Sequence, residues 1–394
     1  MATNTKLVLT QIMKNESHVA ERMLNSIKPI VDAIVVVDTG SEDDSINIVK
    51  NWSKKNNIEC HIFERVFDNF ENSRNFSIEK AREIFLKDNT KDTYYGFWID
   101  FDEELEVLPN FNKNKLDKDF YMVNTVIGSM KYTRNEVYRL DKKFRFYGPV
   151  HEYIIPEEEG ISSGILEGIQ VNVHTDGASW KEDTSNKYKK HANMLEDYLI
   201  KDRNPRWVFY TGQSWHDSAS TKSKTENDER LRRASLYYKE RVSMGDGYPE
   251  ERYYAQYRVA LISKILENPW SETKKELLKA YSIDPLRGES IKVIIEYYQK
   301  IGEWNLSYIY SLLGYTKFHN NSPYPKRLLF VEETIYKWKF LELHMNTLFY
   351  IKDIKGSKKL ANELSNILKK ESHLFKDTDK QRIGNNINRI LSLV

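Results

Sequence analysis

Hydrophobic positions in the first half of the chain alternate between two kinds of segment. Short, continuous apolar runs, which are typical of strands buried on both faces of a sheet, occur at residues 6–12, 33–37, 60–63 and 94–99. Between these runs, apolar residues recur every three or four positions, as on one face of a helix. This second pattern predicts helices over residues 17–27, 43–55 and 72–86. Strands that alternate with helices favour a parallel sheet with right-handed crossovers.

The pattern changes after Pro109. Shorter strand-like segments follow without a long helix between them, at residues 120–126, 137–140, 144–146 and 169–174. Some of these strands must run antiparallel, because parallel neighbours need long crossover connections. The sequence therefore predicts an α/β domain with a mixed sheet over residues 1–179.

From about Trp180 onward the pattern is helical. A connector helix is expected within residues 180–203, at 186–200, and a polar loop at 221–227. Further helices are predicted at 206–218, 229–243, 250–266, 271–281 and 290–302. They form antiparallel-looking pairs close to the ~34-residue period of tetratricopeptide repeats. We expect an all-α domain of degenerate tetratricopeptide-like repeats over residues 204–394.

Composition narrows the classes of function. The 394 residues exceed one ordinary domain, and 60 basic against 58 acidic residues exclude the strong positive charge typical of nucleic-acid-binding proteins. Cys60 is the only cysteine, so no intrachain disulfide and no thiolate zinc cluster can form. No stretch approaches the ~20 apolar residues of a membrane span, and no signal peptide is evident. We expect a soluble protein of the cytoplasm, or of the host cytoplasm if the gene is viral.

Two aspartates directly follow the apolar run at 94–99. Asp100 and Asp102 flank Phe101, and ligands of parallel sheets bind beyond the carboxyl ends of the strands. Carboxylate oxygens suit Mg²⁺ or Mn²⁺, which often bind few protein groups and complete their coordination with substrate phosphates. The alternative is an acidic turn, and the two aspartates by themselves would favour it.

Asp38 ends the second apolar run and precedes Gly40 and Ser41. A carboxylate there can accept hydrogen bonds from a base or a ribose hydroxyl. It can equally close a turn, with Ser41 capping the next helix. Both interpretations can hold together.

Other polar residues sit near predicted strand ends and helix starts. Asn15 and Glu16 follow the first strand, where they contact a base or cap the next helix; Asn15 or Ser17 is the expected N-cap. Arg74 opens the third helix and either binds a nucleotide through stacking or a phosphate contact, or lies in solvent.

Three further residues are candidates for catalysis or metal binding. Glu152 is placed to act as a general base that deprotonates an acceptor, and His151 to orient that acceptor or contact phosphate. His174 ends the last predicted strand and is a candidate metal ligand. Each also has a purely structural alternative, as an exposed turn or a strand end.

In this order and spacing, the motifs resemble family 2 glycosyltransferases of the GT-A fold, in particular the subgroup with an appended helical repeat that includes a peptide S-glycosyltransferase acting on a bacteriocin. The resemblance covers residues 6–177 and extends through the connector to 204–210. It rests on Asn15-Glu16, Val35-Val36-Val37-Asp38-Thr39-Gly40-Ser41, Ser73-Arg74-Asn75, Trp98-Ile99-Asp100-Phe101-Asp102, Gly148-Pro149-Val150-His151-Glu152 and His174.

The resemblance implies inverting transfer from a nucleoside-diphosphate sugar, commonly a UDP-sugar, with Mn²⁺ or Mg²⁺. By analogy, Asp38 and Arg74 serve the nucleoside, Asp100 and Asp102 serve the metal and diphosphate, and His151 and Glu152 match a motif of the subgroup. Many relatives have a small residue where Phe101 stands, so the bulk of Phe101 is expected to change how the sugar sits.

The acceptor expected from this architecture is a protein, a peptide or a glycan that the helical domain recruits, and the chain is a candidate homodimer. Two other functions are open. One is a non-enzymatic interaction protein whose helical repeat binds a peptide beside a relic α/β domain. The other is a nucleotidyltransferase, which also uses paired carboxylates, although no glycine-rich phosphate loop precedes them.

Overall fold

In the computed structural model, the described residues are 4–87, 91–127, 130–181, 183–323, 326–327 and 329–393. The chain divides into two compact units, residues 1–202 and 203–394. Among the described residues, no helix combines the length and apolar character that crossing a membrane requires.

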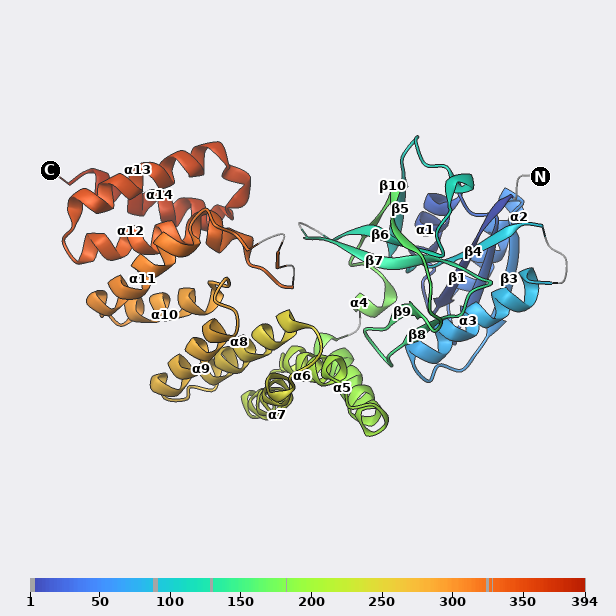
Figure 1. Cartoon of the computed structure of the whole chain (residues 1–394), viewed down its shortest axis with the longest axis horizontal. Coiled ribbons are helices and arrows are strands. Elements are labelled where there is room, and N and C mark those ends of the chain that lie inside the picture. Colours follow the sequence, from blue (N-terminus) through green and yellow to red (C-terminus); the bar gives the residue numbers. More distant parts are fainter. Residues whose placement is uncertain are drawn as a thin grey trace. The chain divides into compact units, whose positions relative to one another are not determined.

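The first unit is built on a mixed sheet whose described strands have the order β3-β2-β1-β4-β7-β6-β10-β5 (Figure 1). The first four strands run parallel, and their bounds are β1 (Thr5–Met13), β2 (Ala33–Asp38), β3 (Glu59–Glu64) and β4 (Thr93–Phe97). The apolar runs of the sequence predicted each of them. In the register of β1 and β2, Met13 lies opposite Asp38, so both strands end at the same edge.

The remaining strands of the sheet are β5 (Glu103–Val107), β6 (Phe120–Ile127), β7 (Met130–Arg139) and β10 (Ser163–Val173). Strand β7 pairs antiparallel with β4, which confirms the predicted mixed sheet. Strands β8 (Phe144–Tyr147) and β9 (Tyr153–Pro156) form a separate antiparallel pair. The sequence did not predict β5, because its acidic residues read as a loop; the structure buries Glu103 beside Arg134.

Three helices cover the parallel part of the sheet: α1 (Ala20–Ile27), α2 (Ser45–Asn56) and α3 (Phe70–Phe85). Alternation along β1 separates two cores, because Leu7 and Leu9 join α1 and α2 in one cluster while Val8 joins α3 in another. Burial on both faces explains why these strands are apolar at successive positions.

The predicted N-cap of the first helix was wrong. Helix α1 starts after Val19 without a side-chain cap, so neither Asn15 nor Ser17 caps it. Asn15 has a positive φ of 56° and its Oδ1 accepts a hydrogen bond from the Glu42 amide at 2.8 Å instead. Helix α3, by contrast, is capped by Asn69, whose side chain accepts a bond from the Asn72 amide.

Two helices complete the first unit, α4 (Ala178–Lys181) and α5 (Thr184–Lys201), and a short 3₁₀ turn, η1 (Lys113–Lys115), lies between β5 and β6. Helix α5 follows the N-cap Asp183. It is tied to α3 because the Tyr198 hydroxyl donates to the buried Glu71 carboxylate at 3.1 Å.

The second unit is all-α, as predicted. Its elements are α6 (Pro205–Ser218), α7 (Lys224–Ser243), α8 (Pro249–Ile265), α9 (Trp270–Ile283), α10 (Glu289–Lys300), α11 (Trp304–Phe318), η2 (Ile335–Lys339), α12 (Phe340–Tyr350), α13 (Ile354–Lys370), η3 (Ser372–Leu374) and α14 (Asp377–Leu391). Successive helices pack against each other, and α7 begins inside the loop predicted at 221–227, because Ser223 caps it through the Glu226 amide.

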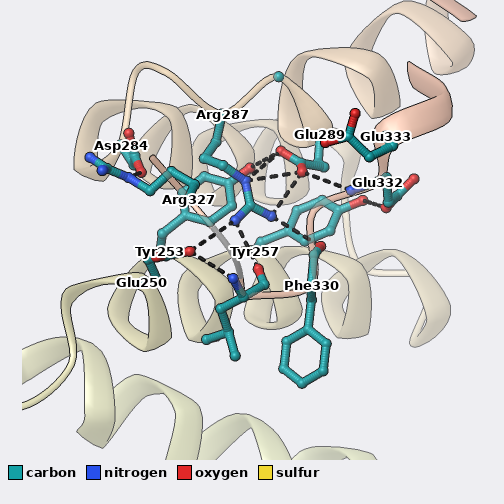
Figure 2. Close-up of polar contacts among 12 residues, drawn as sticks. Glu250, Tyr253, Tyr257, Asp284, Arg287, Glu289, Arg327, Phe330, Glu332 and Glu333 are labelled. Atoms are coloured by element: carbon teal, nitrogen blue, oxygen red, sulfur yellow. Dashed lines mark hydrogen bonds and ion pairs between the residues drawn. The ribbon is translucent and has the colours of Figure 1, made fainter. Parts of the chain in front are cut away.

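A buried polar cluster joins the middle of this unit to the segment after α11 (Figure 2). Arg287 is 0% exposed and pairs with Glu289 at 2.8 Å. Its remaining donors reach the carbonyl oxygens of Leu329 at 2.9 Å and Phe330 at 3.1 Å. Glu250 accepts a hydrogen bond from the Leu329 amide at 2.8 Å. This cluster therefore fixes the backbone near residue 330 to the helices.

Candidate active site

The carboxyl ends of the parallel strands bring the predicted residues to one edge of the sheet. Strand β1 is followed by Asn15 and Glu16, β2 ends at Asp38, and β4 leads into the turn that holds Asp100 and Asp102. This edge is where ligands of open α/β sheets bind.

Asp38 closes a turn through one carboxylate oxygen, and its second oxygen is available to a ligand. Its Oδ2 accepts hydrogen bonds from the amides of Gly40 and Ser41, both at 3.0 Å, and Gly40 has a φ of 101° that favours glycine. This confirms the turn interpretation. Ser41 does not cap α2, because its Oγ accepts from the Asn15 amide at 2.9 Å. The Asp38 Oδ1 is buried and has no hydrogen-bond partner within the structure described, so a ligand donor there would be stabilised.

Glu16 lies among other carboxylates. Its backbone amide donates to Ser45 at 2.7 Å, and its Oε2 accepts a bond from the Ala178 amide at 3.1 Å. Burial, with a smaller contribution from the negative charges of Asp102 and Asp100, raises the pKa of Glu16 to about 7. The neighbouring carboxylates of Asp102, Asp100 and Asp43 add negative charge at this edge.

Arg74 joins two of the predicted residues. It is 4% exposed and donates to Asp100 Oδ1 at 2.7 Å, to Glu152 Oε1 at 2.6 Å and to Gln11 Oε1 at 2.9 Å. The alternative of a solvent-exposed Arg74 was wrong, since the start of α3 faces the sheet and not the solvent. Its guanidinium also lies 4.6 Å from the centre of the Trp98 ring.

Asp100 is held firmly in this cluster. Gln11 donates a second hydrogen bond to Asp100 Oδ1 at 2.9 Å. Burial would raise the pKa of Asp100, but the positive charges of Arg74 and Arg134 outweigh it and hold that pKa below the ordinary value. Asp100 is therefore a fixed, charged carboxylate.

Sequence reasoning missed a second arginine cluster beside the first. Arg134 of β7 binds Glu103 through two hydrogen bonds of 2.7 and 2.8 Å and Glu136 at 2.7 Å. Glu103 in turn accepts a bond from the Asp100 amide at 3.0 Å, so the cluster supports the turn that carries the aspartates. Arg134 and Glu136 are two apart on one strand, a spacing that places both on the same face. That spacing, and the polar Gln11 inside an apolar strand, were the available signals.

Asp102 sits where the turn meets the end of β10. Its backbone oxygen accepts hydrogen bonds from the His174 amide at 3.1 Å and from Arg22 at 3.4 Å. A Cβ at Gly177 would lie 2.7 Å from the Asp102 Cβ, so only glycine fits there without a shift. Phe101, between the aspartates, is 2% exposed and belongs to the apolar core, so its bulk fills the core rather than the site.

The segment 148–152 is bent and anchored. Gly148 has a φ of 103° and its amide donates to Glu71 at 2.7 Å, and His151 has a φ of 54°. The His151 ring lies edge-on to His191 of α5, 6.3 Å between centres. This bend places Glu152 against Arg74. His174 lies beside Asp102 instead, and its Nε2 is 3.1 Å from Glu104.

The protein groups at this edge suit a cation that is coordinated partly by the substrate better than one that is coordinated by protein ligands alone. Among the residues that the structure describes, no group of three or more His, Cys, Asp or Glu is arranged to hold a metal ion. Asp102 and Glu16 nevertheless bring carboxylate groups to one edge, where the negative charge of Asp102 acts on Glu16. Such a set suits Mg²⁺ or Mn²⁺ bound together with phosphate oxygens.

No protein-family model matches the chain. The SPbeta prophage-derived glycosyltransferase SunS of Bacillus subtilis (strain 168) is 24% identical over 271 residues, which are 65% of this chain and 58% of SunS. The glycosyltransferase SunS of Bacillus phage SPbeta matches to the same extent. The chain thus spans less than two thirds of the length of these relatives.

Solved structures show weaker likeness. TarS residues 1–349 of S. aureus in complex with UDP-GlcNAc has a TM-score of 0.36 and 12% identity, covering 66% of this chain and 90% of that one. The pilus biogenesis factor PilW has a TM-score of 0.29 and 12% identity over 50% of this chain and 91% of that one. It is the sequence similarity to the SunS glycosyltransferases that confirms the family resemblance carried by the motifs.

Proposed function

We propose that this protein is an inverting, metal-dependent glycosyltransferase that moves a sugar from a nucleoside-diphosphate sugar, of which a UDP-sugar is the best candidate. The observation that carries the proposal is the meeting of Asp38, Asp100 and Asp102 at the carboxyl edge of the parallel strands. The similarity to glycosyltransferase SunS supports the same reaction class.

The nucleoside part of the donor would bind at the turns after β1 and β2. The unpartnered Asp38 Oδ1 is a ready acceptor for a ribose hydroxyl or a base N–H. Asn15 and Glu16 line the neighbouring turn, where Asn15 Oδ1 already accepts the Glu42 amide and so links the two loops. Arg74 would contribute indirectly, by holding Asp100 and Glu152 in place, because its N–H groups are already bonded to Asp100, Glu152 and Gln11.

Mn²⁺ or Mg²⁺ would be held by Asp102 and by donor phosphate oxygens, with Glu16 close by and Asp100 and His174 as further candidates. When bound, the cation would neutralise the diphosphate that leaves. Gly177 leaves room for the Asp102 side chain, which any larger residue at position 177 would displace.

Glu152 is the candidate general base for the acceptor, with His151 beside it. Inversion needs a single displacement, so one carboxylate that takes the proton of the attacking group is sufficient. The 2.6 Å bond from Arg74 Nε orients the Glu152 carboxylate and joins it to Asp100. The acceptor itself, a protein, a peptide or a glycan, would be recruited by the helical second unit.

Calorimetric titration of the full chain with a panel of UDP-sugars, with and without Mn²⁺, tests the proposal. We expect one UDP-sugar to bind in the presence of Mn²⁺ and to lose affinity when EDTA is added. Release of UDP, rather than pyrophosphate, would separate sugar transfer from nucleotidyl transfer, and NMR of the product would show the inverted anomer.

A matched pair of variants makes the titration specific. Asp102→Asn removes a charge from the proposed metal site, whereas Glu106→Gln removes one from the same acidic segment, at an exposed residue of β5. Metal-dependent binding should be lost in the first variant and retained in the second. Failure of every sugar nucleotide to bind the wild type would contradict the proposal and favour a non-enzymatic interaction protein.

A further inference from the structure

A groove with a volume of about 600 Å³ lies between α7, α8 and α9 in the second unit. Its walls include the apolar side chains of Val242 from α7 and of Leu278 and Ile283 from α9. Because the groove is open to solvent, it suits an extended segment of a polypeptide better than a small molecule, which is usually enclosed by its site.

Gln256 of α8 supplies a polar group to this groove. It lines the groove although its side chain is 4% exposed. Its Nε2 donates to the Glu276 carboxylate at 2.7 Å and to the Glu276 backbone oxygen at 3.2 Å, and these two acceptors fix the orientation of the amide. In the part of the chain that the structure describes, no group donates to Gln256 Oε1. That oxygen can therefore accept a backbone N–H of a ligand.

Three lysines of α9 line the same groove, namely Lys274, Lys275 and Lys279. Lys274 Nζ lies 3.1 Å from the neutral Tyr298 hydroxyl, Lys275 is exposed, and Lys279 donates to Glu276 at 2.9 Å. Their aliphatic stems extend the apolar lining, while their ammonium groups bring more positive charge than Glu276 offsets. The groove therefore attracts carboxylates.

The second unit as a whole has the same sign of charge. Residues 203–394 contain 33 lysine and arginine residues against 23 aspartate and glutamate residues, whereas residues 1–202 contain 27 against 35. The near-neutral total of the chain thus combines an acidic first unit with a basic second unit. An acidic partner is attracted to the second unit and repelled by the first.

Another face of α8 is already occupied by the chain itself. The Phe330 ring lies 4.5 Å from the Tyr254 ring, measured between centres, and Glu250 accepts a hydrogen bond from the Leu329 amide (Figure 2). This leaves the groove beside α9, with Gln256, for a partner.

From the apolar walls, the acceptor at Gln256 and the lysines together, we infer that this groove binds an extended polypeptide segment rich in acidic and apolar residues. Its apolar side chains would lie against Val242 and Leu278, and its carboxylates would pair with the lysines. A nucleic acid would match the lysines but not the apolar walls. The inference narrows the acceptor of the proposed transfer to an acidic polypeptide, and in that respect it rests on the proposed function.

Fluorescence anisotropy of short labelled peptides tests the inference on the full chain, without any sugar donor. The probes have equal length, and they alternate glutamate with leucine, glutamate with serine, or lysine with leucine. The first should bind, the second should bind more weakly and the third should not bind, and added salt should weaken the first. Absence of binding by the first probe, or equal binding of all the probes, would overturn the inference. Neither result depends on sugar-nucleotide binding, so it leaves the proposed function untouched.

A matched pair of double variants locates the site. Lys275→Glu with Lys279→Glu should weaken binding of the glutamate–leucine peptide by about tenfold or more, because attractive contacts become repulsive. Lys355→Glu with Lys359→Glu is the control, since these exposed lysines have the same spacing on α13. Unchanged binding in the first variant, or an equal loss in both, would overturn the inference. Displacement of the peptide by a single-stranded oligonucleotide that binds more tightly would indicate a nucleic-acid site and overturn it as well.

Discussion

Each unit contains a buried arginine among carboxylates, but the two clusters differ in how far their polar groups are exposed to solvent. Arg287 in the second unit satisfies its donors with Glu289 and two backbone carbonyls, deep in the helical core (Figure 2). Arg74 in the first unit binds Asp100 and Glu152 at a sheet edge, where the Asp100 side chain is 36% exposed. Buried charge by itself therefore does not mark a functional site.

What marks the first cluster is a nearby acceptor without a partner. Around Arg287 the polar groups are paired within the protein, so the cluster serves to hold chain segments together. At the sheet edge beside Arg74, by contrast, burial raises the pKa of Glu16 to about 7, and Asp38 Oδ1 is buried with no hydrogen-bond partner in the structure described. An incomplete, negatively charged cluster at an edge is suited to a cationic or hydrogen-bond-donating ligand.

The largest effect on stability is expected at Arg287. Arg287→Leu leaves Glu289 buried without its counter-charge and should lower the free energy of unfolding by about 3–5 kcal/mol. Arg327→Leu, which removes a partly exposed partner of Asp284, should cost about 1 kcal/mol or less. Urea unfolding followed by circular dichroism would compare the two. Loss of sugar-nucleotide binding in Arg287→Leu under conditions where the chain is folded would break the contrast between the clusters.

Glu152→Gln should lower the transfer rate by about 10²–10⁴-fold, the range of general-base catalysis. The glutamine Oε1 can still accept the bond from Arg74 Nε, so donor affinity and thermal stability should change little. Initial rates and calorimetry would measure both. A variant that retained activity, alongside an inactive Glu152→Ala, would instead give Glu152 the role of positioning Arg74.

Asp102→Asn should weaken metal-dependent activity by about a hundredfold, with no loss of stability, because its carboxylate is proposed to face the cation. Activity titrated against Mn²⁺ would show a raised metal requirement. An unchanged metal requirement would place the cation elsewhere.

A smaller effect is expected from pH. Burial, against the attraction of Arg134 and with added repulsion from Glu103, raises the pKa of Glu136 to about 8. The folded state therefore holds this proton more tightly than the unfolded state, whose glutamate pKa is about 4.3. Stability from this group is full below that value and declines as pH rises through about 8.

Glu136→Gln should flatten that decline, because the variant has no titrating group at this position while Arg134 keeps Glu103 as its partner. Thermal melting at several pH values would show the difference in slope. Parallel slopes for the variant and the wild type would mean that Glu136 stays ionised in the folded chain.

The sequence predicted the parts of the fold that local pattern controls. The apolar run at 33–37 became β2 because both faces of that strand are covered, and Asp38 closed the predicted turn because its carboxylate reaches two amides nearby. The strand β5 escaped prediction, since Glu103 is buried only by virtue of Arg134, 31 residues away. Sequence pattern does not reveal such distant partners.

The site followed the same rule. The strand-end positions of Asp38, Asp100 and Asp102 were evident from spacing. The pairing of Arg74 with Glu152, 78 residues apart, was not, because it depends on how α3 packs under the segment at 148–152. The metal ligands, the sugar and the acceptor stay predictions.

Helix α5 has a practical consequence for dissecting the chain. Tyr198 binds Glu71, Glu71 binds the Gly148 amide, and His191 contacts His151, so this helix buttresses the bend that presents Glu152. A fragment that ends after β10 would keep the strands of the sheet but would lose the contacts that α5 makes with this segment. A minimal fragment for activity measurements should therefore retain the chain through residue 202. Inactivity of a shorter fragment would reflect loss of the contacts that hold the segment at 148–152, and would not show that the helical unit takes part in the chemistry.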